Sequence, residues 1–300
     1  MLAGMNITWG DIEKSIETLR KVDGGFSAAY RGVITLSDGM QVFVKAGVND
    51  LTKKWVRKEI EVYRFLQRQN YPFIPQLFAH NHDQTGFALE AFIPEDGWNW
   101  SNEWTQQRFT KTLEAMDTLA IIQPGDTDKD VFGSEMLKET DDGWQPLKAS
   151  KELQYTLLKK LRSARYNNVA KALDFDAEAE RSSTFLFRKD TLVHDDVRAD
   201  NSPWHARRQV VRLVDWNWTQ LGDRRIDLAA LLVDVHQSGL DVTQAAGDRL
   251  NADALHWLTG FWFKAAATPI WPGGPAHLRD FQLQSAMTAW KLARISSGSP

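Results

Sequence analysis

The chain has 300 residues, 43% of them hydrophobic and 25% charged, and a formal net charge of −3. These values are typical of a globular protein with a substantial core, and we expect neither nucleic acid nor a membrane surface as a partner. The absence of cysteine excludes disulfides and thiolate metal sites. Because the first residues lack the regions of a signal peptide and no apolar stretch is long enough to span a bilayer, we expect a cytoplasmic protein.

The beginning of the chain predicts a helix followed by a β-hairpin. Thr8 is a suitable N-cap for an amphipathic helix that runs to about Arg20. Further along, Asp38 and Gly39 separate two segments rich in β-branched and aromatic residues, which is a strong hairpin signal. The second of these segments ends in Lys45, and a lysine at such a place commonly just extends its amine to solvent.

A pair of glycines precedes the first strand of this hairpin. Gly24 and Gly25 form a predicted bend in front of Ser27. Glycines at such a bend let backbone N–H groups approach a phosphate closely. Taken alone, however, a Gly-Gly bend is most often only a turn.

Residues 51–69 predict an amphipathic helix. It carries two glutamates, Glu59 and Glu61, close to several basic residues. Most glutamates in this setting are solvated surface charges. One of the two could instead reach Lys45 and hold its amine in place.

Two further strands and a linker complete the first part of the chain. Residues 76–80 and 86–93 predict strands, and the segment P-E-D-G at 94–97 predicts a hinge. We therefore expect residues 1–93 to form a small lobe built on an antiparallel sheet with one inserted helix. Residues 94–300 are expected to form a larger lobe.

The larger lobe is predicted to be mainly helical, which makes the protein α+β and two-lobed. Its residues 126–150 are polar and predict an irregular loop. The predicted helices span residues 101–122, 151–165, 169–181, 223–235, 251–267 and 276–295.

Three oxygen-bearing side chains follow two short apolar runs in this second part. The first run leads through residues 192–193 to Asp196 and Asn201, and the second, residues 210–214, leads to Asp215. Side chains at the junctions of strands and loops can be held close together by a rigid scaffold. Carboxylate and amide oxygens suit a proton acceptor and a magnesium site.

These segments together resemble the aminoglycoside phosphotransferase and choline kinase group, whose fold is protein-kinase-like. The similarity extends over nearly the whole chain, and its segments occur in the order of that group. The matching segments are G-G-F-S at 24–27, V-F-V-K at 42–45, R-K-E-I-E-V-Y-R-F-L at 57–66, H-D-D-V-R-A-D-N at 194–201, L-V-D-W at 213–216 and G-D-R-R-I-D-L-A at 222–229.

The resemblance implies a division of roles for phosphoryl transfer from ATP. Asp196 would accept or orient the proton of a substrate hydroxyl, and Asn201 and Asp215 would hold Mg²⁺. Lys45 would contact phosphate oxygens and be held by Glu59, which is preferred over Glu61 because it matches the glutamate of the group. The remaining implied ATP contacts are made by Gly24, Gly25, Ser27 and the backbone from Glu90 to Phe92.

Several residues depart from the pattern of the group or have a supporting role. Asp195 stands where the group commonly has glycine, and Ser202-Pro203 replaces an apolar pair, so the strand after the loop is expected to be short. His194 is expected to pack beneath the loop. Asp227 is expected to cap a helix or to hold the backbone of the loop.

The acceptor is the least determined feature of the sequence. Tryptophans after the hinge suit a sugar face or a quaternary ammonium group if they are exposed, but at helical spacing tryptophans are more commonly core residues. Acidic residues late in the chain would favour an amino sugar or amino alcohol. The residues in question are Trp98, Trp100, Trp104, Asp241, Asp248 and Asp253.

Our main hypothesis is an ATP- and Mg²⁺-dependent phosphotransferase that acts on a hydroxyl of a small molecule, such as an aminoglycoside or a choline-like alcohol. The alternative is a catalytically degenerate kinase-like module that binds nucleotide. A protein kinase is disfavoured because the sequence lacks an Ala-Pro-Glu segment. The sequence leaves the oligomeric state and the choice between ATP and GTP open.

Overall fold

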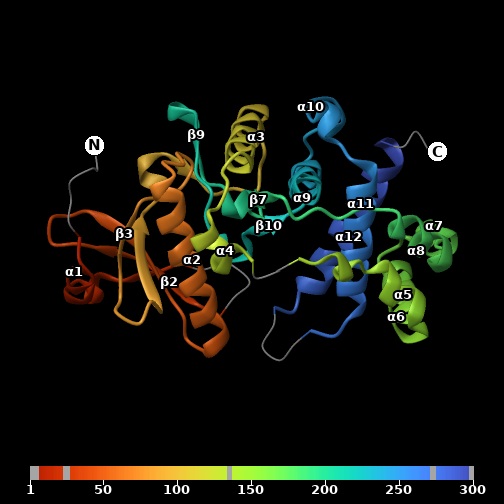
Figure 1. The fold of residues 1–300 in the computed structure, drawn as a ribbon, viewed down its shortest axis with the longest axis horizontal. Coiled ribbons are helices and arrows are strands. Elements are labelled where there is room, and N and C mark those ends of the chain that lie inside the picture. Colours follow the sequence, from red (N-terminus) through yellow and green to blue (C-terminus); the bar gives the residue numbers. More distant parts are fainter. Residues whose placement is uncertain (1–6, 23–27, 134–136, 271–274, 297–300) are drawn as a thin grey trace. The chain divides into compact units, whose positions relative to one another are not determined.

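The computed structural model describes residues 7–22, 28–133, 137–270 and 275–296. The chain divides into two compact units (Figure 1). The first unit comprises Met1–Ser134 and Ala199–Gln220, and the second comprises Glu135–Arg198 and Leu221–Pro300. A small antiparallel sheet and a larger helical region confirm the predicted α+β class. The lobe boundary expected between residues 93 and 94 stays a prediction.

The first unit is built on a five-stranded antiparallel sheet with the strand order β1-β2-β3-β5-β4. The predicted hairpin connects β2 to β3, and Gly39 at its turn has a φ of 85°, a value that glycine adopts without strain. The strands are β1 (Arg20–Lys21), β2 (Tyr30–Thr35), β3 (Gln41–Ala46), β4 (Leu77–His80) and β5 (Gly86–Glu90).

The side chains of β3 alternate between two different environments. Val42 and Val44 are buried in an apolar cluster with Ile12 and Ile34. Lys45 lies one position further along the strand and therefore points to the opposite face of the sheet. This alternation brings the lysine to the face that bears the pocket described below.

Helix α2 (Asp50–Arg68) packs against β3, β4 and β5. It begins one residue earlier than predicted because Asn49 and Thr52 form a capping box there. Glu59 is buried on this helix, whereas Glu61 is half-exposed and forms an ion pair with Arg64. The buried glutamate is thus the one that matches the glutamate of the resembling group.

The first helix, α1 (Trp9–Lys14), is shorter than predicted. The expected extension to about Arg20 is wrong because Arg20 and Lys21 pair with β2 instead. Thr8 caps α1 as expected. The sheet therefore competes successfully with the helical pattern for these residues.

The rest of the first unit consists of short elements around one long helix. That helix, α3 (Gln106–Ala120), starts after Thr105 rather than after Ser101, because the Thr105 side chain accepts the capping hydrogen bond. The other elements are α4 (Lys129–Phe132) and the small antiparallel sheet of β6 (Trp98–Asn99), β8 (Trp204–His205) and β9 (Val210–Val211).

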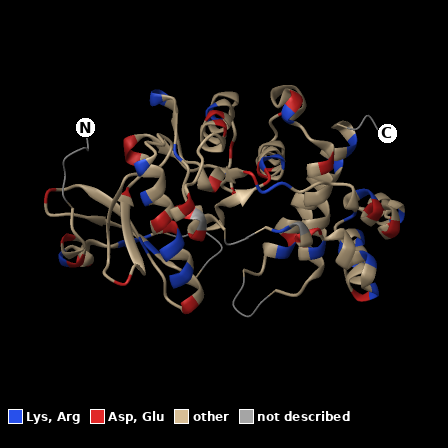
Figure 2. Ribbon diagram, viewed as in Figure 1, with Lys and Arg blue, Asp and Glu red and all other residues tan. Residues whose placement is uncertain are grey.

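The second unit is mainly helical, and basic and acidic residues are interspersed along it and along the first unit (Figure 2). A two-stranded sheet pairs β7 (Thr191–Val193) with β10 (Gln220–Gly222). The helices are α5 (Trp144–Ala149), α6 (Lys151–Ser163), α7 (Asn167–Ala172), α8 (Phe175–Ser183), α9 (Arg224–Gln237), α10 (Val242–Ala245), α11 (Ala252–Ala267) and α12 (Leu278–Ser296).

Helix α5 lies in a segment that was predicted to be an irregular loop. Its Trp144 is fully buried against Phe263 and Trp290. The helix approaches α11 so closely that a Cβ atom on Gly143 would lie 1.7 Å from the carbonyl oxygen of Gly260. This contact between small residues is not visible in a local pattern, so the prediction of an irregular loop is wrong here.

Among the described residues, no helix is both long enough and apolar enough to span a membrane.

Candidate active site

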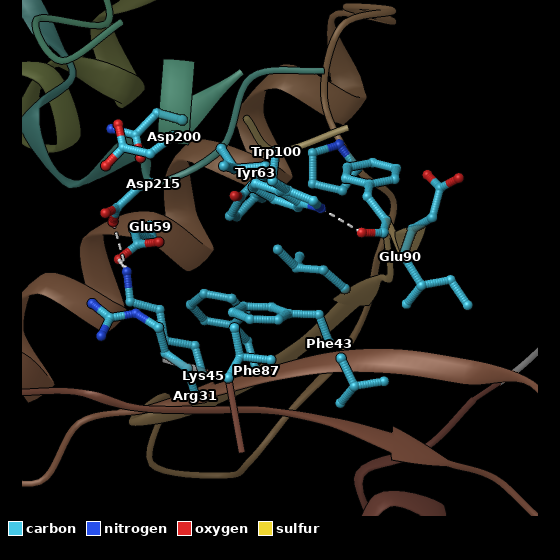
Figure 3. A pocket seen from close by; sticks show the side chains of 18 of the residues that line it. Arg31, Phe43, Lys45, Glu59, Tyr63, Phe87, Glu90, Trp100, Asp200 and Asp215 are labelled. Carbon is cyan, nitrogen blue, oxygen red and sulfur yellow. Dashed lines mark hydrogen bonds and ion pairs between the residues drawn. The ribbon is translucent and has the colours of Figure 1, made fainter. Parts of the chain in front are cut away.

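The first unit contains a pocket of about 410 Å³ between the sheet, α2 and the segments after β5 and β9 (Figure 3). Most of its wall is apolar, with Val33, Phe43, Phe87, Leu89 and Phe92 among the lining side chains. One part of the wall is instead polar. The polar lining residues include Lys45, Glu59, Asp200, Asn201 and Asp215.

Lys45 is the centre of this polar part. Its Nζ atom lies 2.5 Å from Oε1 of Glu59 and 2.7 Å from Oδ1 of Asp215. Burial disfavours the charged amine, but the carboxylates of Asp215 and Glu59 outweigh this effect and raise the pKa of Lys45 above its ordinary value. The lysine is therefore a fixed positive charge rather than a solvent-exposed side chain.

Glu59 has an unusual protonation equilibrium for a glutamate. Its side chain is only 1% exposed, and this burial raises its pKa to about 7, although the ammonium group of Lys45 opposes the shift. Asp215 is different because a quarter of its side chain reaches solvent. Separating Asp215 from Lys45 therefore costs less free energy than separating Glu59 from Lys45, because water can solvate the Asp215 carboxylate.

The backbone at Asp215 adopts a conformation that few residue types other than glycine accept. Asp215 has a φ of 66°, in the left-handed region. The segment before it is tied down, because Leu213 N–H donates to the Phe73 carbonyl at 2.6 Å and Val214 N–H donates to the Asn201 carbonyl at 3.0 Å. The fully buried Trp216 donates its indole N–H to the Leu213 carbonyl at 2.9 Å.

Arg108 organises the segment that carries Asn201. Its guanidinium group is 1% exposed and donates to the carbonyls of Ala199 at 2.5 Å and Ser202 at 2.9 Å. It also donates to the carbonyls of Ser101 at 2.7 Å and Glu103 at 2.8 Å. One buried side chain of α3 thus fixes two loop segments of this unit, a role that no local sequence pattern indicates.

The second unit carries the loop that contains Asp196. The Asp196 N–H donates to Nδ1 of the buried His194 at 3.3 Å, and Oδ1 of Asp196 accepts a hydrogen bond of 2.9 Å from Arg198. Asp227 on α9 accepts from the N–H groups of His194 at 3.3 Å and Asp195 at 2.9 Å. The expected supporting roles of His194 and Asp227 are therefore confirmed.

Asp195 has a φ of 61°, in the left-handed region that glycine adopts most easily. This conformation gives a physical reason for the glycine that the resembling group commonly has at this position. Aspartate is one of the few other residues that tolerate the left-handed conformation. The departure is thus compatible with the loop geometry.

Asn201 and Asp215 are the residues whose oxygens were predicted to hold a metal ion. Within the described part of the chain, no group of three or more His, Asp or Glu side chains is arranged to hold a metal ion on its own. Mg²⁺, however, is commonly bound by one or two protein oxygens and completes its shell with water and substrate phosphates. An amide and a carboxylate lining the same pocket fit that requirement.

The predicted site residues thus fall into three groups. Lys45, Glu59, Glu90, Phe92, Asn201 and Asp215 all line the pocket of the first unit, and Asp196 belongs to the second unit. Gly24, Gly25 and Ser27 lie outside the described residues. The pocket also includes Arg31 and Trp100, which were not among the predicted nucleotide contacts.

No protein-family model matches the chain, and no curated protein matches it in sequence. Solved structures do match over most of its length. The choline kinase LicA from Streptococcus pneumoniae has a TM-score of 0.57 at 13% identity, with 93% of this chain and 96% of that chain covered. A spectinomycin phosphotransferase in complex with ADP and spectinomycin has a TM-score of 0.57 at 11% identity, with 93% and 92% covered.

A Plasmodium vivax ethanolamine kinase has a TM-score of 0.54 at 11% identity, with 97% of this chain and 87% of that chain covered. The fold is protein-kinase-like. The kinase-like fold and the likeness to aminoglycoside phosphotransferases and choline kinases are those that the sequence motifs predicted. At these identities the likeness concerns the fold alone.

Proposed function

We propose that this chain is an ATP- and Mg²⁺-dependent phosphotransferase that moves the γ-phosphoryl group to a hydroxyl of a small molecule. The observation that carries this proposal is the burial of Lys45 between Glu59 and Asp215 in the polar part of an otherwise apolar pocket. An apolar pocket suits a nucleobase, and a fixed cation beside a solvent-accessible carboxylate suits phosphates with a bound magnesium ion.

The residues of the first unit would bind and orient ATP. The apolar walls and the backbone from Glu90 to Phe92 would take the base, and Lys45 would contact phosphate oxygens while Glu59 keeps its amine in place. Asn201 and Asp215 would hold Mg²⁺. When bound, this ion would neutralise negative charge on the transferred phosphoryl group.

Asp196 would act on the acceptor. Its carboxylate would orient the substrate hydroxyl and accept its proton. The hydrogen bonds that Asp227 accepts from the loop backbone, and the one that the Asp196 N–H donates to His194, would keep this carboxylate in one position. Arg198, which donates to Asp196 at 2.9 Å, would have to share the carboxylate with the hydroxyl.

The wider setting of the reaction belongs to the same proposal. Residues 1–93 would form the nucleotide-binding lobe and residues 94–300 the catalytic and acceptor-binding lobe. The acceptor would be an aminoglycoside, a choline-like alcohol or another small metabolite. We expect the reaction to take place in the cytoplasm, without nucleic acid or membrane as a partner.

The experiment that tests this function compares Asp196→Asn with Asp195→Asn. A coupled ADP assay would screen aminoglycosides, choline-like alcohols, sugars and homoserine. Asp196→Asn is expected to lose at least about 100-fold in turnover because it removes the proton acceptor, while keeping its affinity for ATP. The matched variant Asp195→Asn removes the neighbouring carboxylate and is expected to keep most of the activity.

The alternative is a degenerate module that binds nucleotide but transfers no phosphoryl group. It predicts a different result. The ion pair between Asp196 and Arg198 favours it, because the carboxylate already has a partner. In that case ATP with Mg²⁺ would raise the melting temperature of the protein, but no acceptor would yield ADP. Normal turnover by Asp196→Asn would instead contradict the assignment of the proton acceptor.

A further inference from the structure

Trp100 forms part of the pocket wall next to the segment that would bind the base. Its indole N–H donates a hydrogen bond of 2.6 Å to the carbonyl oxygen of Phe92. The side chain lines the pocket, and in Figure 3 it lies on the side opposite Phe43 and Phe87. Trp100 is 38% exposed, so it is not simply a core residue of the unit.

The hydrogen bond matters because adenine and guanine present different groups to a backbone segment. Adenine offers a 6-amino donor and the N1 acceptor, which match one carbonyl and one N–H group. In the proposed site these would be the Glu90 carbonyl and the Phe92 N–H. Guanine in the same position would place its O6 against the Glu90 oxygen and its N1–H against the Phe92 N–H, and both contacts are repulsive.

Guanine could avoid these repulsive contacts by shifting along the segment. Its O6 would then accept from the Phe92 N–H, and its N1–H and 2-amino groups would need the Phe92 carbonyl as their acceptor. That oxygen already accepts from Trp100. A carbonyl oxygen has two lone pairs, but the indole ring lines the pocket and donates to this oxygen, so a shifted guanine would have to compete with it for the same acceptor.

We propose that Trp100 makes this pocket selective for adenine over guanine nucleotides by occupying the Phe92 carbonyl. This inference rests on the proposed function, because it requires the pocket to bind a nucleoside triphosphate. It makes Trp100 a specificity-determining residue for a choice that the sequence left open. Lys45 and Asp215 contribute equally to the binding of both nucleotides, because the phosphates of ATP and GTP are identical.

The test measures the dissociation constants of ATP and GTP, each with Mg²⁺, by calorimetry on the full chain. The wild type is expected to bind ATP at least about tenfold more tightly than GTP, the usual effect of a misplaced or missing hydrogen bond in a binding site. Trp100→Phe keeps an aromatic ring but removes the N–H donor. This variant is expected to lower the ratio of the GTP to the ATP dissociation constant about tenfold, mainly through tighter GTP binding.

Trp9→Phe is the matched control, since it makes the same chemical change in the same unit, at a side chain that packs against the apolar cluster of Val42 and Val44 and is not part of the pocket lining. Its ratio is expected to equal that of the wild type. The inference is overturned if the wild type binds both nucleotides within about twofold, or if Trp100→Phe leaves the ratio unchanged. If neither nucleotide binds to the wild type, the proposed function itself fails.

Discussion

Lys45 donates a hydrogen bond of 2.7 Å to Asp215, a residue 170 positions later in the chain. The carboxylate that would hold Mg²⁺ is therefore the one that pairs with the lysine proposed to bind phosphate. Both partners also have alternatives, because Lys45 pairs with Glu59 and Asp215 reaches solvent. The two groups can thus separate around a magnesium nucleotide without leaving a buried charge unpaired.

The pairing of Lys45 with Glu59 predicts that a second substitution restores part of the stability lost through the first. Lys45→Met should lower the free energy of unfolding by up to about 3 kcal/mol, because it leaves Glu59 buried without its cation, and Glu59 must then either stay charged or take up a proton. Lys45→Met combined with Glu59→Met should be more stable than the single variant, because no uncompensated charge remains. Urea unfolding of the two variants and the wild type measures this difference.

Both of these variants should bind ATP with Mg²⁺ at least about tenfold more weakly than the wild type, since each lacks the cation for the phosphates. This separates stability from function in one pair of proteins. Equal losses of stability in the single and the double variant would contradict the account of the buried pair.

Arg108 should be necessary for the geometry of Asn201. Arg108→Met removes one hydrogen-bond donor from each of four carbonyl oxygens and should cost about 3 kcal/mol or more of unfolding free energy. Arg108→Lys should recover part of this loss, because an ammonium group reaches fewer of these oxygens. Arg207→Met, an exposed change in the same unit, is the control and should cost less than about 0.5 kcal/mol.

The same substitution predicts a change in metal response. Because Arg108 holds the carbonyls on both sides of Asn201, Arg108→Met should weaken the Mg²⁺ dependence of ATP binding. This dependence is measured by determining the dissociation constant of ATP at a series of Mg²⁺ concentrations. A variant that loses stability but keeps the wild-type magnesium response would limit Arg108 to a role in folding.

Asp227 should make stability depend on pH. Burial raises its pKa from 3.8 to about 6, although the N–H groups of Asp195 and His194 oppose the shift. Between these values the folded protein binds more protons than the unfolded chain, so this group's contribution to stability is largest at low pH. It is lost as pH rises through about 6, and amounts to about 3 kcal/mol at most.

Asp227→Asn tests this assignment because asparagine stays neutral throughout. Asparagine also replaces one of the two acceptor oxygens by an NH₂ group, so the variant should be less stable than the wild type at pH 4.5. The deficit should shrink at pH 7.5, where the wild type carries the buried charge. Urea unfolding at the two pH values measures it, and a deficit that is constant with pH would refute the raised pKa.

Asp195 should be replaceable only by residues that accept a left-handed backbone. Asp195→Gly and Asp195→Asn should keep the stability of the wild type within about 0.5 kcal/mol. Asp195→Val should lose about 1–2 kcal/mol, because a β-branched residue is strained at a φ of 61°. Thermal unfolding of the three variants decides the point, and a stable valine variant would show that the loop can relax.

The sequence alone predicted the features that depend on short-range patterns. The turn at Asp38 and Gly39 and the helix that became α2 follow from turn chemistry and periodicity, which act within a few residues. The motif around Asp196, Asn201 and Asp215 was recognisable because chemistry restricts the residue types there. The choice of Glu59 over Glu61 came from the resemblance of residues 57–66 to the same group, and the ion pair with Lys45 agrees with it.

The tertiary structure decided the features that depend on partners far away in the chain. Trp144 forms part of a helix core because α11 and α12 bury it, and Arg108 meets the carbonyls of Ala199 and Ser202 more than 90 residues later. The contact of Trp100 with Phe92 follows from the path of the chain after β5. A sequence specifies which residues can form such contacts, but only packing in three dimensions selects the partner, because burial and hydrogen bonding are satisfied by spatial neighbours.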